Sequence, residues 1–320
     1  MLGFVLAFVA TVLHIALCFA GAPLALGVIN KLRAWLLGRR GPPVTQPYLS
    51  LAKLLRKSTL VPDTATDLFT LWPLGAFLAL AVATMLIPGF CTGMLTNDAG
   101  DYITIVGLFG LARAATMLGG LETGFGFGGA GAAREALFSL FAEGALLVLL
   151  LAFSLMAHDT SVDGIAAAFR AAHIGVSVSL GFALAAMLTV ALTETGRIPT
   201  DNPSGHLELA MVHEAMALEY SGRLLALLDY AGMLRLIAWM NLIGTIFLPF
   251  GMASAGDVLS WPGGLLLWAG KLAFMAVALS IFEVSRAKMR VFRVPEFLGA
   301  ALLLGMLASV FLFVAARIGA

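Results

Sequence analysis

Long apolar runs dominate the chain and alternate with short polar segments. Eight runs lie near residues 3–29, 70–90, 102–121, 136–157, 173–194, 225–249, 263–284 and 297–316. A helix of about 20 apolar residues crosses the ~30 Å hydrocarbon core of a membrane. The pattern therefore predicts one all-α, polytopic membrane helix bundle of about eight transmembrane helices over residues 1–320, with no separate soluble domain.

One polar segment has a helical pattern of its own. In "QPYLSLAKLLRKS", residues 46–58, apolar side chains share one helical face and basic side chains lie beside it. The apolar set is Tyr48, Leu51, Leu54 and Leu55, and the basic set is Lys53, Arg56 and Lys57. This arrangement predicts an amphipathic helix in the membrane interface. A shorter segment, "VDGIAAAFRAA", has a similar pattern between the fourth and fifth spans.

The basic residues predict the orientation, because Lys and Arg accumulate in cytoplasmic loops. Fourteen of them fall on one side: Lys31, Arg33, Arg39, Arg40, Lys53, Arg56, Lys57, Arg134, Arg197, Arg223, Arg286, Lys288, Arg290 and Arg293. Arg170 and Arg317 are the exceptions on the other side. We therefore expect cytoplasmic loops at 30–69 and 195–224, both termini outside, and the inner membrane of a bacterial or archaeal cell as the location.

The amino-acid composition agrees with a membrane protein and argues against nucleic-acid binding and against metal sites built from cysteine. Hydrophobic residues make up 61% of the chain, against roughly 45–50% in soluble domains, and the mean hydropathy is +0.99. A net charge of +1 gives no nucleic-acid footprint. The two cysteines, Cys18 and Cys91, form no CxxC motif, so we expect neither an iron–sulfur cluster nor structural zinc in this chain.

Two further motifs are better explained by coincidence. "GFGFGGAG" contains the spacing GxGxxG at Gly126, Gly128 and Gly131, but no strand precedes it, and we interpret it as a flexible loop. His206 and His213 could share a helix face, yet "HEAMALE" lacks the second histidine of HExxH. We therefore predict no metal site.

Ionisable residues inside the spans need an explanation, because a charge at the bilayer centre costs about 2.5–3.5 kcal/mol or more. They are Arg113, Glu143, Glu194, Asp229, Arg235, Lys271 and Glu283. They could pair as buried ions, and Glu135, Glu194 and Glu283 lie near enough to span ends to be solvated. The alternative is a hydrated series of carboxylates that relays protons.

The densest group of titratable residues lies in "GRIPTDNPSGHLELAMVHEAMALEY", residues 196–220. We predict a helix over 206–220, in which Glu208 and Glu219 share a face and Glu214 projects elsewhere. A solvated face is the simplest explanation of such charges. The neighbouring apolar residues, however, require cover by protein or lipid headgroups.

Three segments together resemble a known family. They are "GRRGPPVTQPYLSLAKLLRKS" (38–58), "TETGRIPTDNPSGHLELAMVHEAMALEYSGR" (193–223) and "EVSRAKMRVFRVPEFLG" (283–299). They resemble the membrane subunit of energy-converting NiFe hydrogenases, the formate hydrogenlyase type included, within the respiratory complex I subunit 1 family. The likeness covers nearly the whole chain and agrees with eight spans.

The resemblance implies a membrane anchor without an active site of its own. The expected partners are hydrogenase large and small subunits, an iron–sulfur protein and antiporter-like membrane subunits. The NiFe centre and the iron–sulfur clusters would belong to those partners, and this chain would bind no cofactor. The carboxylates that it implies as relay candidates are Glu135, Glu143, Glu194, Asp201, Glu208, Glu214, Glu219 and Glu283, to which we add Asp229 for its depth. The docking candidates are Arg39, Arg40, Arg197, Arg286, Lys288 and Arg290.

The central segment departs from the complex I pattern and keeps only a proline, Glu-Leu and the final Glu-Tyr-Ser. This difference counts against quinone binding and favours a subunit that couples hydrogenase electron transfer to proton or sodium movement. Two alternatives stay open. One is the quinone-chamber subunit of a complex I-type NADH:quinone oxidoreductase, and the other is a free-standing ion transporter, although no internal repeat supports the latter.

Overall fold

The computed structural model is an all-α helix bundle and describes residues 2–171, 178–197, 212–287, 289 and 293–318. Its helices are α1 (Leu2–Leu36), α2 (Gln46–Arg56), α3 (Leu71–Leu86), α4 (Tyr102–Leu121), α5 (Gly126–Ala157), α6 (Val162–Ala171), α7 (Val178–Glu194), α9 (His213–Ala217), α10 (Gly222–Phe247), α11 (Trp261–Ser285) and α12 (Val294–Ile318). Short 3-10 turns cover Asp67–Thr70, Asn97–Ala99 and Val258–Ser260. The predicted all-α class is confirmed.

Seven helices in the described part of the chain are long and apolar enough to cross a membrane. They coincide with seven of the eight predicted spans. The fifth predicted span, 173–194, begins in residues that the structure does not describe, and its described part, α7, is an apolar helix of 17 residues. The second span ends at Leu86, before the predicted 90, because Pro88 forces Ile87 into an extended conformation.

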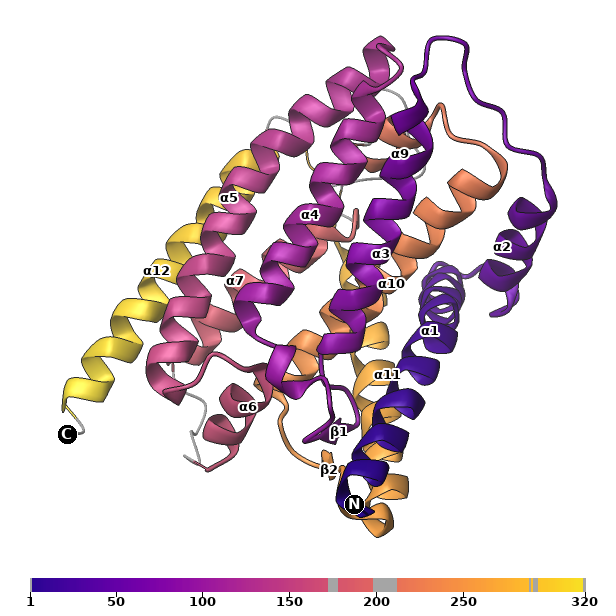
Figure 1. Ribbon diagram of the computed structural model, residues 1–320. Coiled ribbons are helices and arrows are strands. Elements are labelled where there is room, and N and C mark those ends of the chain that lie inside the picture. Colours follow the sequence, from indigo (N-terminus) through magenta and orange to yellow (C-terminus); the bar gives the residue numbers. More distant parts are fainter. Residues whose placement is uncertain (1, 172–177, 198–211, 288, 290–292, 319–320) are drawn as a thin grey trace.

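Helix α10 occupies the centre of the bundle (Figure 1). Of its most apolar 18 residues, 83% are buried, against 11% for α11 at the edge. On one side of it α5 packs against α4 and α12, and on the other α1 packs against α11. Its central position explains how α10 can carry Arg235, Asn241 and Thr245, which are buried, since a polar side chain there meets protein and not lipid.

Helix α1 contains Pro23, yet it runs unbroken from Leu2 to Leu36. A proline inside a helix leaves nearby carbonyl groups without a backbone donor. Two tyrosines supply donors instead: the Tyr230 hydroxyl donates to the Phe19 carbonyl at 2.9 Å, and the Tyr48 hydroxyl donates to the Ala20 carbonyl. These bonds attach α10 and α2 to α1 at the proline.

Two expectations about helix boundaries are wrong. The glycine-rich segment that we interpreted as a flexible loop forms the first turns of α5, because Gly128 lies directly against the Gly120 carbonyl and Gly131 against Val212 and Met216. The helix predicted to reach Tyr220 ends at Ala217. There the chain turns so that Tyr220 stacks on Phe69 at 4.3 Å. The amphipathic helix predicted over 46–58 is confirmed as α2, with its three basic residues exposed.

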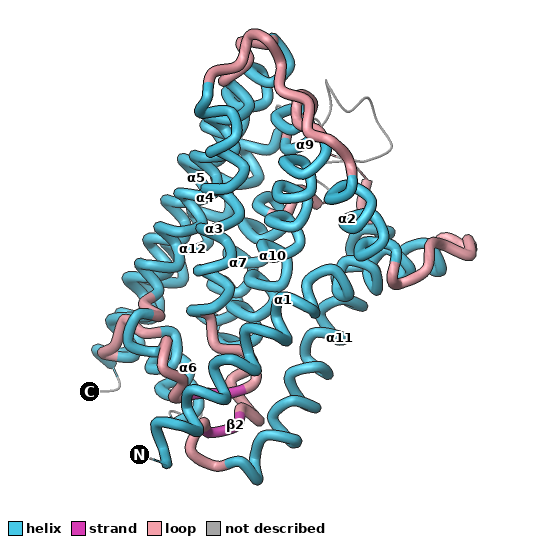
Figure 2. The backbone as a smooth tube through the Cα atoms, turned by 45° about the vertical axis from the view of Figure 1, so that its right-hand side comes forward, coloured by secondary structure: helices cyan, strands magenta, loops and turns pink. Residues whose placement is uncertain are grey.

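The bundle has two distinct ends. The start of α1 and the end of α12 lie together with α6 and with a two-residue parallel pairing of β1 (Cys91–Thr92) and β2 (Ala253–Ser254) (Figure 2). We call this the terminal end. Helix α9 and the turn between α4 and α5 lie at the opposite end, which we call the α9 end. The side of the membrane that each end faces remains a prediction.

Candidate functional site

A cavity of about 690 Å³ opens at the α9 end. It lies between the last turns of α1, the end of α7, α9, the first half of α10 and Glu283 near the end of α11. Charged and ionisable side chains concentrate in its wall: Arg33, Arg39, Glu194, Arg197, His213, Glu214, Asp229, Arg235 and Glu283. These residues come from five separate segments of the chain. Only the fold brings them together.

Arg113 of α4 is the centre of a buried charge cluster behind this cavity. Its Nη1 lies 3.0 Å from Glu143 Oε1, its Nε lies 3.5 Å from Glu135 Oε1, and its Nη2 donates to Glu194. The Arg113 side chain is 1% exposed, and those of Glu135 and Glu194 are each 4% exposed. The Glu143 side chain is 43% exposed. The cluster thus runs from the cavity wall at Glu194 to the side of the bundle at Glu143.

The local structure explains why these groups meet. Glu135 and Glu143 are eight residues apart on α5, which puts them on one face about two turns apart. Gly110 of α4 leaves room for the Glu143 carboxylate. If residue 110 had a Cβ atom, that atom would lie 3.3 Å from Glu143 Oε1. A guanidinium group has five donors in a fixed plane, so one Arg113 can satisfy three carboxylates.

Arg235 and His213 extend the cluster toward the cavity. Arg235 Nη1 donates to the Glu194 backbone carbonyl at 3.1 Å and is buried with it. His213 Nε2 lies 3.9 Å from Glu135 Oε1. Pairing as a buried ion was one of the two explanations that the sequence offered for Arg235, and the Glu194 carbonyl is its hydrogen-bond partner.

Glu283 is the centre of a second cluster in the cavity wall. Its two carboxylate oxygens pair with Arg33 Nη1 at 3.5 Å and Arg197 Nη1 at 3.3 Å, and its side chain is 1% exposed. Burial lowers the pKa of Arg197, while the charge of Glu283 opposes that shift. Glu283 is therefore an internal counter-ion that holds α1, α11 and the segment after α7 together.

Two other relay candidates meet the cavity differently. Glu214 and Asp229 line it, are exposed to it, and have no ion pair within the part of the chain that the structure describes. Glu219 does not line the cavity and lies in the turn beyond α9. Asp201 and Glu208 fall outside the described residues, as does His206.

Three of the docking candidates are exposed, one is paired with Glu283, and two fall outside the described residues. Arg39, Arg40 and Arg286 are exposed at the ends of α1 and α11. Arg197 is 11% exposed and paired with Glu283 in the cavity wall. Lys288 and Arg290 fall outside the described residues.

Sequence reasoning missed a second polar network in the core. His14 Nε2 lies 2.9 Å from the Ile87 carbonyl oxygen, and Cys18 lies beside His14. The Asn241 side-chain amide donates a hydrogen bond to Cys18 Sγ and accepts one from Trp268 Nε1. A histidine within the apolar first span was the available signal. Among the described residues, no group of three or more His, Cys, Asp or Glu side chains could hold a metal ion.

The fold and the site define an all-α, multi-pass membrane protein with a polar chamber at one end and a buried carboxylate cluster behind it. A family model described as NADH dehydrogenase matches residues 8–314. The chain belongs to the respiratory complex I subunit 1 family. The family resemblance inferred from the three sequence segments is therefore confirmed.

Two curated proteins of Escherichia coli (strain K12) are similar to it along most of their length. Formate hydrogenlyase subunit 4 is 31% identical over 304 residues, which cover 93% of this chain and 96% of that protein. Hydrogenase-4 component C is 30% identical over 289 residues, which cover 90% of each. Both are named as parts of hydrogen-related assemblies.

The fold is also shared with a solved structure. A chain in the structure of the membrane-bound sulfane sulfur reductase (MBS), an archaeal respiratory membrane complex, superposes with a TM-score of 0.79. The match covers 95% of this chain and 99% of that one at 19% sequence identity. The similarity extends to the whole bundle and supports a common architecture.

Proposed function

We propose that this chain is the membrane-anchor and ion-coupling subunit of an energy-converting hydrogenase complex. It would dock the NiFe and iron–sulfur subunits at the α9 end and link their electron transfer to proton or sodium translocation. The observation that carries this proposal is the sharing of Arg113 by Glu135, Glu143 and Glu194. This cluster connects a chamber at one end of the bundle with a lateral surface inside the membrane.

The charge of the cluster suits a relay. Three carboxylates face Arg113 and Arg235, so the five groups carry one excess negative charge when His213 is neutral. A proton bound by any one of the three carboxylates would cancel this excess charge. A proton that enters at Glu194 would free Arg113 to turn toward Glu135 and Glu143, which moves charge without moving the backbone.

The exposed side chain of Glu143 indicates where the charge would go next. It lies near the middle of the 32-residue helix α5, where contact with lipid would be costly. A neighbouring membrane subunit of the antiporter-like class would cover it and receive the charge. Such a subunit also fits the names of the curated relatives, which are components of larger assemblies.

The α9 end is the proposed docking face and the cytoplasmic side, with both termini outside. Arg39, Arg40 and Arg286 are exposed there, and Lys and Arg accumulate in cytoplasmic loops. Leu60 and Val61, 72% and 48% exposed in the loop after α2, add an apolar surface that a peripheral subunit would cover. The NiFe centre and clusters would be bound by those partners and not by this chain.

Purification tests the proposal. The chain should be tagged in its own cell membrane, extracted in mild detergent and analysed by mass spectrometry. We expect a hydrogenase large subunit, a small subunit and an iron–sulfur protein to co-purify, and hydrogen turnover in reconstituted vesicles to generate an ion gradient. A chain that purifies alone and transports ions by itself would instead be a free-standing transporter.

One observation favours a second function, that of a quinone-chamber subunit. The cavity of about 690 Å³ falls within the usual range of small-molecule sites, roughly 300–1,000 Å³, and apolar residues such as Leu26 and Met233 share its wall. Extraction of the purified complex with organic solvent distinguishes the two functions. A stoichiometric quinone would support the chamber, whereas its absence in an active complex supports the hydrogenase coupling subunit.

A further inference from the structure

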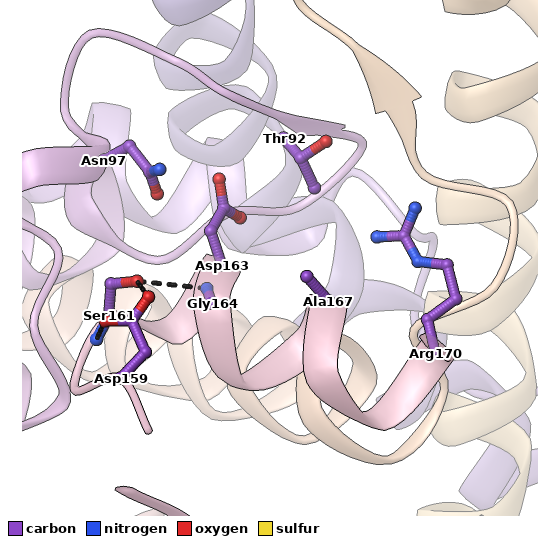
Figure 3. Close-up of a pocket in the computed structure, with 8 residues that line it drawn as sticks. All are labelled: Thr92, Asn97, Asp159, Ser161, Asp163, Gly164, Ala167 and Arg170. Atoms are coloured by element: carbon purple, nitrogen blue, oxygen red, sulfur yellow. Dashed lines mark hydrogen bonds between the residues drawn. The ribbon is translucent and has the colours of Figure 1, made fainter. Parts of the chain in front are cut away.

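A second cavity, of about 480 Å³, lies at the terminal end, far from the charge cluster. Thr92 and Asn97 line it from the loop between α3 and α4, and Asp159, Ser161 and Asp163 line it from the start of α6 (Figure 3). Arg170 lies at the other end of α6. The oxygen-bearing side chains are thus gathered on one side of the pocket and the guanidinium on the other.

Asp163 is the unusual residue of this pocket. It is only 7% exposed, and its Oδ2 accepts a hydrogen bond from the Gly93 backbone nitrogen at 2.9 Å. Its Oδ1 is buried and has no hydrogen-bond partner within the described part of the chain. A buried carboxylate oxygen without a donor is costly, and such an atom normally meets a donor, a water or a cation.

Asp159 places a second carboxylate nearby. Ser161 fixes it, since its backbone nitrogen and its hydroxyl each donate to one Asp159 oxygen at 3.0 Å. Gly164 makes room for it, because a Cβ at this glycine would overlap the Asp159 carboxyl.

We propose that this pocket binds a hard, oxygen-ligated cation of the Ca²⁺ class. Asp163 Oδ1 and the Asp159 carboxylate would supply the charge, and the oxygens of Asn97, Ser161 and Thr92 would be neutral ligands or hydrogen-bond to bound water. With both aspartates ionised, Arg170 leaves one net negative charge in the pocket. Calcium accepts such mixed sets of carboxylate, neutral oxygen and water ligands.

The alternative ligand, an anion, fits less well. The first turn of α6 and Arg170 would attract it, but two carboxylates lie in the same pocket and the unsatisfied atom is an acceptor. With only two carboxylates the site is weak. We expect a dissociation constant of about 10⁻⁴–10⁻³ M, as in extracellular calcium modules.

The test uses the full chain, or the complex that contains it, purified in detergent with EDTA and then titrated with CaCl₂. Saturable binding is measured by isothermal titration calorimetry and by the rise in melting temperature. Asp163→Asn keeps an acceptor for Gly93 and removes the charge, and we expect it to weaken Ca²⁺ binding at least about tenfold. Asp257→Asn, a change at an exposed aspartate of the same end that caps a 3-10 turn, should leave binding unchanged.

Two results would overturn the proposal. One is a lack of saturable Ca²⁺ binding by the unaltered protein, and the other is equal binding by Asp163→Asn. If neither the unaltered protein nor Asp163→Asn changes its melting temperature with Ca²⁺, the pocket is not a cation site. None of these readouts depends on hydrogenase activity, so the inference stands or falls independently of the proposed function.

Discussion

The guanidinium of Arg113 lies 3.0 Å from the carboxylate of Glu143, the one of its three glutamate partners whose side chain remains substantially exposed. Arg113 itself is 1% exposed. The buried guanidinium of Arg113 therefore pairs with the Glu143 carboxylate at the side of the bundle and, at the same time, with two buried carboxylates in the interior. In the proposed relay, this arrangement would pass charge between the chamber and a neighbouring subunit.

Glu143→Gln should leave assembly intact and reduce coupling. Glutamine keeps an acceptor for Arg113 but cannot exchange a proton. Ion translocation per turnover in reconstituted vesicles should fall by about 10²-fold, the effect of removing one proton-transfer group. Ser139→Ala, one turn away on α5, is the matched control. Unchanged translocation in the Glu143 variant would remove this residue from the relay.

Arg113→Gln should be strongly destabilising, because it leaves three carboxylates without their common cation. Loss of one partner of a buried ion pair costs about 3–5 kcal/mol. We expect a lower melting temperature and a lower yield of purified protein, with Arg113→Lys intermediate, since lysine keeps the charge but not the planar set of donors. Arg223→Gln, at an exposed arginine that begins α10, should change neither quantity.

The burial of Glu283 and its two arginine partners predicts how much each substitution in this cluster destabilises the protein. Glu283→Gln should cost about 3 kcal/mol, the lower end for a buried pair, because Arg33 reaches solvent. Arg197→Gln should cost more than Arg33→Gln, since the Arg197 side chain is 11% exposed and that of Arg33 is 29% exposed. Melting temperatures of the three variants give the order, and a larger loss from Arg33→Gln would contradict it.

The crossing of α4 and α5 depends on one glycine of the "GFGFGGAG" segment. Gly128→Ala would force a methyl group into the Gly120 carbonyl, and overpacking of this kind costs about 1–3 kcal/mol. Gly129→Ala is the matched control, because its nearest neighbour is a Leu121 side-chain atom at 3.9 Å. Thermal unfolding of both variants decides whether the segment is a packing element.

A pH-dependent contact should hold the loop before α3. Glu122 accepts hydrogen bonds from Thr66 and from Trp72 Nε1. The bond from Thr66 and then that from Trp72 lower the Glu122 pKa below its usual 4.5. Because the folded pKa is depressed, this contact stabilises the loop above the unfolded pKa and is lost as the pH falls through the folded pKa.

Hydrogen exchange measures that contact. Protection factors of the amides in residues 66–70 should decrease as the pH is lowered from about 5 toward the depressed Glu122 pKa. Glu122→Gln keeps one acceptor but loses the charge and the second acceptor, so its protection factors should be lower than those of the unaltered protein at pH 7 and independent of pH over the same range. Protection that stays constant in the unaltered protein would show that other contacts hold the loop.

The sequence by itself determined seven of the eight predicted spans, the amphipathic helix α2 and the family. Apolar runs of about 20 residues are matched to the thickness of a bilayer, and this requirement acts on each segment separately. The same local reasoning identified Arg113, Glu143 and Arg235 among the charges inside the spans that need an explanation, since the cost of burying a charge can be inferred from its position in a span. It misjudged the glycine-rich start of α5 and the end of α9, where contacts with distant residues override local preference.

Only the tertiary structure decided which charges meet. Arg113 and Glu194 are 81 residues apart, and Arg33 and Glu283 are 250 apart. A periodic pattern gives the face of a helix on which a side chain lies, but the neighbour of that face follows from how all the helices pack, a property of the whole chain. For the same reason, the sequence could not predict that Asp163 Oδ1 lacks a hydrogen-bond partner. That follows from the packing of α6 against the loop at Gly93.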